Sequence, residues 1–170
     1  KIIELFTKND VDGLPEFDTQ FARGILEIAK PKKFSDLVQI SGLSHGTKVW
    51  EGNAKDLIQH DGKTLEDVIG NRDKIVLDLL DHGLDIAIAD GISKVVKKGK
   101  PLKPEVVQAM RDHNVPEWYI DSLKKITYLY PKAHAAAYVM SALRIAYFKV
   151  YYPVEFYATI MTYRSADFDI

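Results

Sequence analysis

Two pairs of carboxylates have a spacing that could hold a divalent metal ion. Asp10 and Asp12 form one pair, and Asp167 and Asp169 form the other, each with one residue between the two acids. In an extended segment this spacing turns both side chains to the same side, and carboxylate oxygens are ligands that Mg²⁺ accepts in phosphoryl-transfer sites. No buried strand is predicted beside either pair, so a surface role is the favoured interpretation.

A second candidate for chemistry is the segment Ser41-Gly-Leu-Ser-His-Gly-Thr47. Its glycines, hydroxyls and imidazole could offer backbone N–H groups and side-chain donors to an anion, although a plain turn is the simpler alternative. The two common glycine-rich phosphate-binding patterns are absent from the chain, and its five histidines include no pair spaced three or four apart. With no cysteine in the sequence either, thiolate sites are excluded and a histidine metal site is not indicated.

Apolar residues recur every three or four positions, which predicts helices throughout. First-turn prolines, glycine stops and the proline breaks after Lys30 and Tyr152 give the expected boundaries. A Thr64-Leu-Glu-Asp67 capping box predicts one short helix, and a loop is expected at 41–52. The helices are expected at 15–28, 34–40, 64–69, 73–80, 86–96, 105–112, 117–128, 133–151 and 154–162.

The predicted fold class is therefore all-α, an irregular set of about eight to nine short helices plus one long apolar helix. With 170 residues, 46% of them hydrophobic, the chain suits a single domain over 1–170. It lacks an apolar run long enough to span a bilayer, and the absence of cysteine favours an intracellular, cytoplasmic location. Because it begins at Lys1 without an initiator Met, we expect a longer parent protein.

Charge is distributed unevenly behind a net value of −1. Residues 1–90 hold 11 basic against 17 acidic side chains, whereas residues 91–154 hold 11 against 4. A basic block of this kind is typical of a surface that meets phosphates, although a solvated helix face is an equally ordinary explanation.

Four segments carry a resemblance to a known family. They are Gly13-Leu-Pro-Glu-Phe17, Ile40 to Thr47 with Val49-Trp50, Val115-Pro-Glu-Trp-Tyr-Ile-Asp121 and Pro131-Lys-Ala-His-Ala-Ala-Ala-Tyr-Val139. In order and spacing they resemble the PolC-type DNA polymerase III alpha subunits, the C-family replicative polymerases of Gram-positive bacteria and mollicutes.

The resemblance implies the fingers region of such a polymerase, with residues 155–170 starting the connection to a duplex-binding part. It implies that the catalytic palm carboxylates lie upstream, so that this region alone is inactive and ligates none of the Mg²⁺ of the full enzyme. Asp10 and Asp12 do not match those carboxylates. The implied partners are a DNA primer-template, a dNTP and the remaining domains of the parent polymerase.

The same resemblance implies a set of residues that contact the dNTP or the template. Lys132 is expected to act as a point charge and His134 to donate to a phosphate oxygen, near the positive end of a long helix. From the residues alone, His134 could equally be a packed histidine and a lone Arg a solvated one. The remaining members of the set are Arg23, Ser44, His45, Gly46, Arg72, Lys97 and Lys98.

Two other classes of function stay open on the sequence. One is a non-catalytic helical DNA-binding module that uses the basic 91–154 region as a phosphate clamp. The other is a protein-interaction domain whose uneven charge docks an acidic partner.

Overall fold

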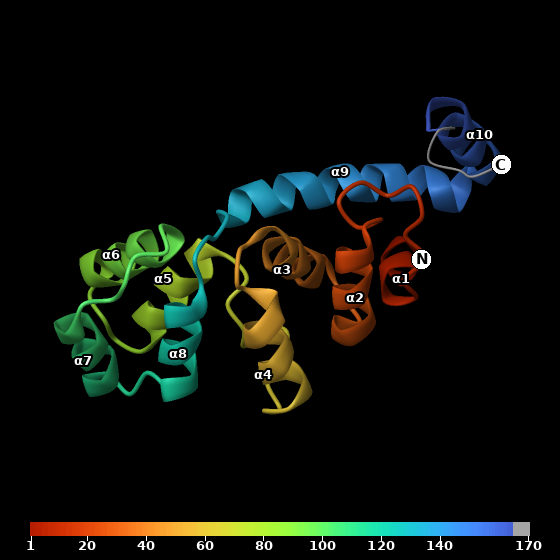
Figure 1. The fold of residues 1–170 in the computed structure, drawn as a ribbon. Helices are drawn as coiled ribbons and strands as arrows, with labels where there is room; N and C mark the ends of the chain where they lie inside the picture. The colour runs from red at the N-terminus through yellow and green to blue at the C-terminus, as the bar shows by residue number, and fades with distance from the viewer. Residues whose placement is uncertain (165–170) are drawn as a thin grey trace.

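The computed structural model describes residues 1–164 of the chain, which are helical and contain no strand. Ten α-helices and one short π-helical segment follow each other along the sequence (Figure 1). Their bounds are α1 Ile2–Thr7, α2 Gln20–Ala29, α3 Phe34–His45, η1 Trp50–Ala54, α4 Lys55–Gln59, α5 Arg72–Asp81, α6 Ile86–Lys97, α7 Pro104–Asp112, α8 Glu117–Lys125, α9 Lys132–Tyr151 and α10 Pro153–Tyr163.

The described residues are all-helical, but the expected long apolar helix is wrong. There are ten α-helices within the described residues, and the longest of them, α9 with 20 residues, is not an apolar helix. It buries one narrow stripe of small side chains, mainly Ala135, Val139, Ala142 and Ala146. The rest of its surface carries cations and half-exposed aromatic rings, which the apolar composition of the segment concealed. Among the described residues no helix has the length and hydrophobicity needed to cross a membrane.

α2 and α5 each begin after a residue whose side chain accepts a hydrogen bond from a first-turn N–H group. Thr19 accepts from the N–H of Ala22 at 3.1 Å, and Asn71 accepts from that of Lys74 at 2.9 Å. Pro104 occupies a first-turn position, as expected, and Pro153, expected as a break between two helices, opens α10. Pro15 does not, because the residues that follow it form turns and α2 begins only at Gln20.

The loop expected at 41–52 is shortened at its start and otherwise largely present, since Glu51 and Gly52 have non-helical backbone angles within η1. α3 continues through Ser41 and Gly42 to His45, and η1 follows at Trp50. Gly42 does not end the helix. It allows α3 to touch the segment before α5, since a Cβ added at Gly42 would lie 2.1 Å from the carbonyl oxygen of Gly70.

The helix expected at 64–69 is a hydrogen-bonded turn. The backbone N–H and the hydroxyl of Thr64 both donate to Oδ2 of Asp67, each at 2.7 Å. The capping interaction is therefore present, but no helical run follows it before Gly70.

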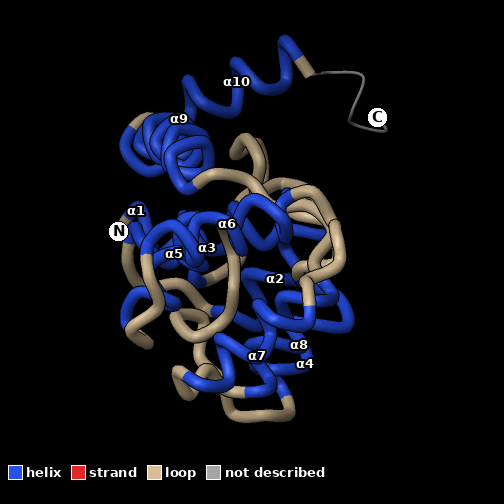
Figure 2. Tube along the Cα trace, turned by 90° about the vertical axis from the view of Figure 1, so that its left-hand side faces the viewer, coloured by secondary structure: helices blue, strands red, loops and turns tan. Residues whose placement is uncertain are grey.

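α9 lies along one side of the other helices and joins two groups of them. α1, α2 and α3 pack beneath it, while α5 to α8 gather beyond its N-terminal end (Figure 1). Seen nearly along its axis, α9 stands above the remaining helices and α10 leads away from it (Figure 2). α3 and α9 pack together, and Ile40 and Leu43 of α3 and Val139 and Ala142 of α9 are all buried.

The division of the chain into a single domain with a connection at 155–170 stays a prediction. α10 covers the first part of that stretch and packs on the loop after α1, where a Cβ at Gly13 would meet Cδ1 of Ile160 at 2.1 Å. Residues 165–170, with the Asp167 and Asp169 pair, lie outside the described residues.

Replacing Gly42 by Ala should destabilise the fold by about 1 to 3 kcal/mol, because the new methyl group would push α3 away from Gly70. Urea unfolding of the chain measures the effect. Gly91 in α6 is the matched control, since a Cβ there meets nothing within 4 Å and Gly91→Ala should gain up to about 1 kcal/mol of helix propensity. Equal effects of the two substitutions would contradict the close approach.

The pKa of Asp67 is lowered by the backbone hydrogen bond from Thr64 and then by that residue's hydroxyl. A lowered folded-state pKa means that the ionised carboxylate stabilises the fold above its ordinary pKa of 3.8 and that this contribution is lost as the pH falls below it. Asp67→Asn should therefore unfold with a weaker pH dependence than the wild type between about pH 5 and pH 3. Parallel stability curves for the two proteins would contradict this.

Candidate functional site

Three helices meet at the extended segment Ile126–Pro131, which leads into α9 and is called the linker below. Thr47, just after α3, donates its N–H to the carbonyl of Tyr128 at 3.0 Å, and its own carbonyl accepts from the N–H of Thr127 at 3.1 Å. At the start of α5, the N–H of Arg72 donates to the carbonyl of Tyr130 at 3.1 Å. These bonds satisfy three polar groups of the linker backbone and fix where α9 begins.

Glycines allow two segments, the one after α3 and the one after α6, to pack closely against the linker. A Cβ at Gly46 would lie 2.3 Å from Cγ2 of Val49 and 3.0 Å from the carbonyl oxygen of Tyr128. A Cβ at Gly99, after the end of α6, would lie 2.8 Å from the carbonyl oxygen of Thr127. The C-terminal end of α6, which carries Lys97 and Lys98, is thereby placed against the linker.

α5 also supplies a carboxylate to the first turn of α9. The backbone N–H of Lys132 donates to Oδ2 of Asp73 at 2.6 Å, while Pro131 at the N-cap has no side chain that could do so. Part of the positive end of the α9 dipole is therefore already used by a protein carboxylate. Any anion that approaches this end must rely on side-chain donors as well.

An aromatic cluster surrounds His134 on the other side of this turn. Its imidazole stacks on the ring of Tyr130, with centroids 4.7 Å apart and planes 11° apart, and lies 4.6 Å from the ring of Tyr138. His45, at the end of α3, contacts both tyrosines, with centroid distances of 5.7 and 6.3 Å. Two of the histidines expected in the site thus share one cluster, drawn from α3, the linker and α9.

The two histidines differ in what their ring nitrogens contact. Nδ1 of His45 lies 2.7 Å from the carbonyl oxygen of Ser41 and 2.9 Å from Oγ of Ser44, and Nε2 is paired with the carboxylate of Glu16. His134 makes no hydrogen bond to another described side chain. His134 is therefore the histidine whose ring nitrogens remain able to donate to a ligand.

The cations near this cluster form no ion pair within the described residues. Lys132 is exposed, and neither its ammonium nor the guanidinium of Arg72 is paired with an acid of residues 1–164. The same holds for Lys97 and Lys98. Lys132 also borders a cavity of about 300 Å³ between α3 and α5, which Asp36 and Asp78 help to line.

Arg23 is the one expected site residue that the fold places elsewhere. Its guanidinium contacts Asp12 at 2.6 Å and Asp18 at 2.5 Å, and it donates to the carbonyl of Asn9 at 3.2 Å. Although burial works in the opposite direction, hydrogen bonds to Asp18 and the charge of Asp12 raise the pKa of Arg23 above its ordinary value.

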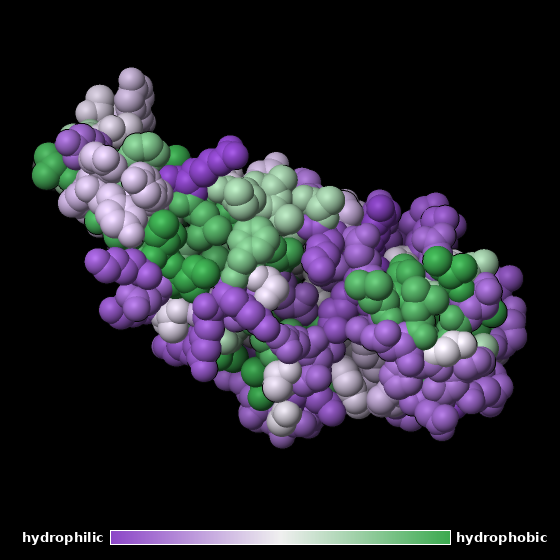
Figure 3. Space-filling model, turned by 180° about the vertical axis from the view of Figure 1, so that it is seen from behind, coloured by the Kyte–Doolittle hydropathy of each residue, from purple (hydrophilic) through white to green (hydrophobic). Residues whose placement is uncertain are grey.

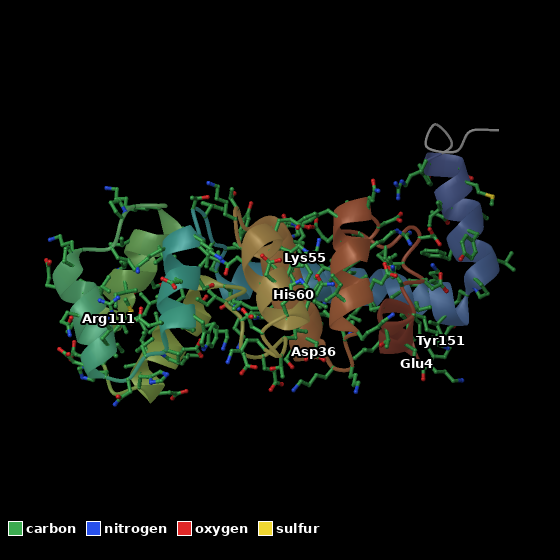
Figure 4. The ribbon with its side chains drawn as sticks, turned by 60° about the horizontal axis from the view of Figure 1, so that its bottom comes forward. Glu4, Asp36, Lys55, His60, Arg111 and Tyr151 are labelled. Carbon is green, nitrogen blue, oxygen red and sulfur yellow. The ribbon has the colours of Figure 1, made fainter. Side chains whose placement is uncertain are left out.

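Lys149, near the C-terminal end of α9, contacts the same loop as Arg23 and shows how far Arg23 lies from His134. Its buried ammonium contacts Oδ1 of Asp10 at 2.7 Å and the carbonyl of Asp12 at 3.1 Å. Lys149 follows His134 by fifteen residues, which corresponds to about 22 Å along the axis of α9. Glu4 and Tyr151 line a groove between α1 and α9 at this same end (Figure 4).

Hydrophobic surface gathers in two places on the back of the molecule, over α9 with α1 and over the region of α6, with hydrophilic surface between them (Figure 3). Met140 and Phe148 of α9 are half-exposed, and Ile86 and Ile88 of α6 are exposed. In the described residues no group of three or more His, Cys, Asp or Glu side chains is arranged to hold a metal ion.

The family assignment follows from a sequence profile. The bacterial DNA polymerase III alpha subunit finger domain matches residues 1–117. The chain belongs to this family.

Full-length relatives of this finger domain are named DNA polymerase III PolC-type, which confirms the resemblance read from the sequence. The protein of Bacillus subtilis is 56% identical over 158 residues, 93% of the chain and 11% of the relative. That of Listeria monocytogenes is 54% identical over 170 residues, 100% of the chain and 12% of the relative. That of Halalkalibacterium halodurans is 53% identical over 167 residues, which are 98% of the chain and 12% of the relative. The finger domain chain therefore spans about an eighth of the length of these relatives.

Sequence reasoning missed several residues of the finger domain that shape this site. Glu16 and Asp73 each act through a partner that is distant in the sequence, whereas Tyr138 contacts His134 one turn earlier in the same helix. Glu16 lies within a segment that carried the family resemblance, but nothing there indicated its partner.

Replacing Asp73 by Ala should cost about 1 kcal/mol of stability, because the first turn of α9 loses its capping acceptor. Urea unfolding measures the loss, and hydrogen exchange of the Lys132 amide should become faster. Asp81→Ala, at the other end of α5, is the control and should stay within about 0.5 kcal/mol of the wild type. An unchanged exchange rate at Lys132 would contradict the capping role.

Proposed function

We propose that this chain is the fingers part of a DNA-directed DNA polymerase and that the start of α9 binds the triphosphate of an incoming dNTP. The observation that carries the proposal is the linker, which brings the first turn of α9, with Lys132 and His134, next to the start of α5 at Arg72 and the end of α6. A triphosphate needs several positive or N–H donors at one point, and these side chains are unpaired within the described residues.

Each residue has a distinct part in this proposal. His134, steadied by its stacking on Tyr130, donates a hydrogen bond to a phosphate oxygen. Lys132 and Arg72 supply positive charge, and Ser44, His45 and Gly46 form the wall of the pocket behind His134. Lys97 and Lys98 lie where they could meet the phosphates of a template strand, adding affinity without reading sequence.

Nucleotidyl transfer by such a polymerase uses Mg²⁺, which we propose is held by carboxylates of the parent protein outside this chain. The pair Asp10 and Asp12 fits a metal site poorly, because Asp10 contacts Lys149 and Asp12 contacts Arg23. The contribution of these residues is to bind and orient the nucleotide against the template, which lowers the barrier by positioning. The remaining polymerase domains, a DNA primer-template and a dNTP are the corresponding partners, and a cytoplasmic location goes with this function.

The role of Arg23 as a triphosphate or template contact stays a prediction. For Arg23 to contact a ligand through its guanidinium, its bonds to Asp12 and Asp18 would have to break.

In the full-length parent protein, Lys132→Ala and His134→Ala should each raise the KM for dNTP about tenfold, the effect of one lost charge-assisted hydrogen bond. Steady-state kinetics on a primed template measures this. Lys124→Ala is the matched control, since that exposed lysine of α8 is paired with Asp121, and its KM should not change. If both variants keep the wild-type KM but bind duplex with reduced salt dependence, a DNA clamp without a nucleotide site is the better description.

A further inference from the structure

Glu16 has a backbone conformation that residues with a Cβ avoid. Its φ is +70°, in the left-handed region, although it is not a glycine. Its neighbours Leu14 and Phe17 are fully buried and fix the loop between α1 and α2 in place. The side chain of Glu16 is itself about a quarter exposed, so packing does not explain why a glutamate stands there.

The carboxylate of Glu16 is directed at Nε2 of His45. Nδ1 of the same ring lies 2.7 Å from the carbonyl oxygen of Ser41, so both ring nitrogens face oxygen atoms of the protein. Contacts at opposite edges of the imidazole fix its orientation more firmly than either contact alone.

The ring of His45 lies next to the two tyrosines that hold His134. Its centroid is 5.7 Å from that of Tyr130, edge to face, and 6.3 Å from that of Tyr138. Those tyrosines lie 4.7 and 4.6 Å from the ring of His134. A continuous row of contacts therefore runs from the carboxylate of Glu16 through His45 to His134.

We propose that Glu16 is a positioning residue for the nucleotide site, which acts on His134 through His45 and the two tyrosines. The proposal rests on the function proposed above for His134. Glu16 does not contact the nucleotide itself, because a carboxylate repels a triphosphate and this one is directed at the imidazole. Its effect is on nucleotide binding, which requires His134 to be held in one orientation.

Glu16→Gly separates this role from a structural one. It removes the carboxylate and also relieves the left-handed backbone, so the melting temperature should stay the same or rise. In the full-length parent protein the KM for dNTP should nevertheless increase about fivefold, with kcat within about twofold of the wild type. Glu16→Gln keeps an oxygen acceptor and should restore most of the affinity.

The matched control is Asn114→Gly between α7 and α8, where φ is +57° and no described side chain is bonded to the asparagine. This variant should gain similar backbone relief without any change in KM. An unchanged KM in Glu16→Gly overturns the proposal, and so does an equal rise in Asn114→Gly.

A double-mutant cycle tests the route through His134. In a His134→Ala background, Glu16→Gly should change the KM by less than about twofold, because the residue being positioned is gone. A full, independent fivefold effect in that background overturns the proposal. If His134→Ala raises the KM but Glu16→Gly does not, this inference alone fails. If His134→Ala leaves the KM unchanged, the function proposed above fails and this inference fails with it.

Discussion

The hydrogen bonds to the linker Ile126–Pro131 are the constraint on which the arrangement depends. An extended segment has no internal partners for its N–H and C=O groups, so in the interior it must find them on its neighbours. Thr47 and Arg72 supply them through their backbones, and Gly46 and Gly99 allow the required closeness. α3, α5 and α6 are all distant in sequence from the linker, and they thereby converge on the point where α9 begins.

Local sequence signals predicted much of the helical content, because proline, glycine and capping residues act over a few positions. They failed where a tertiary contact decided the outcome. Ser41 and Gly42 looked like the end of a helix. Gly42 instead lies inside α3, where the absence of a Cβ allows the helix to approach Gly70 closely. The composition of 133–151 looked apolar, yet its small residues form one buried stripe and its aromatic rings point outward.

The residues expected in the candidate site come together only in part, and their roles stay predictions. The family resemblance selected residues on five separate segments, and the linker gathers all of them except Arg23. No local pattern could have separated Arg23 from the others, because its partners Asp12 and Asp18 become neighbours only through the loop between α1 and α2. For the same reason Glu16 and Asp73 carried no signal, since each depends on a group more than twenty residues away.

α9 is anchored at both of its ends by groups that point in fixed directions, Lys149 toward Asp10 and His134 toward Tyr130. A helix turns about 100° with every residue. Inserting or deleting a single amino acid between these anchors would therefore rotate one of them far from its partner while the other stayed in place. The length of this segment is as strictly determined as the identity of its end residues, so length variation here should be far less tolerated than substitution on its outward face.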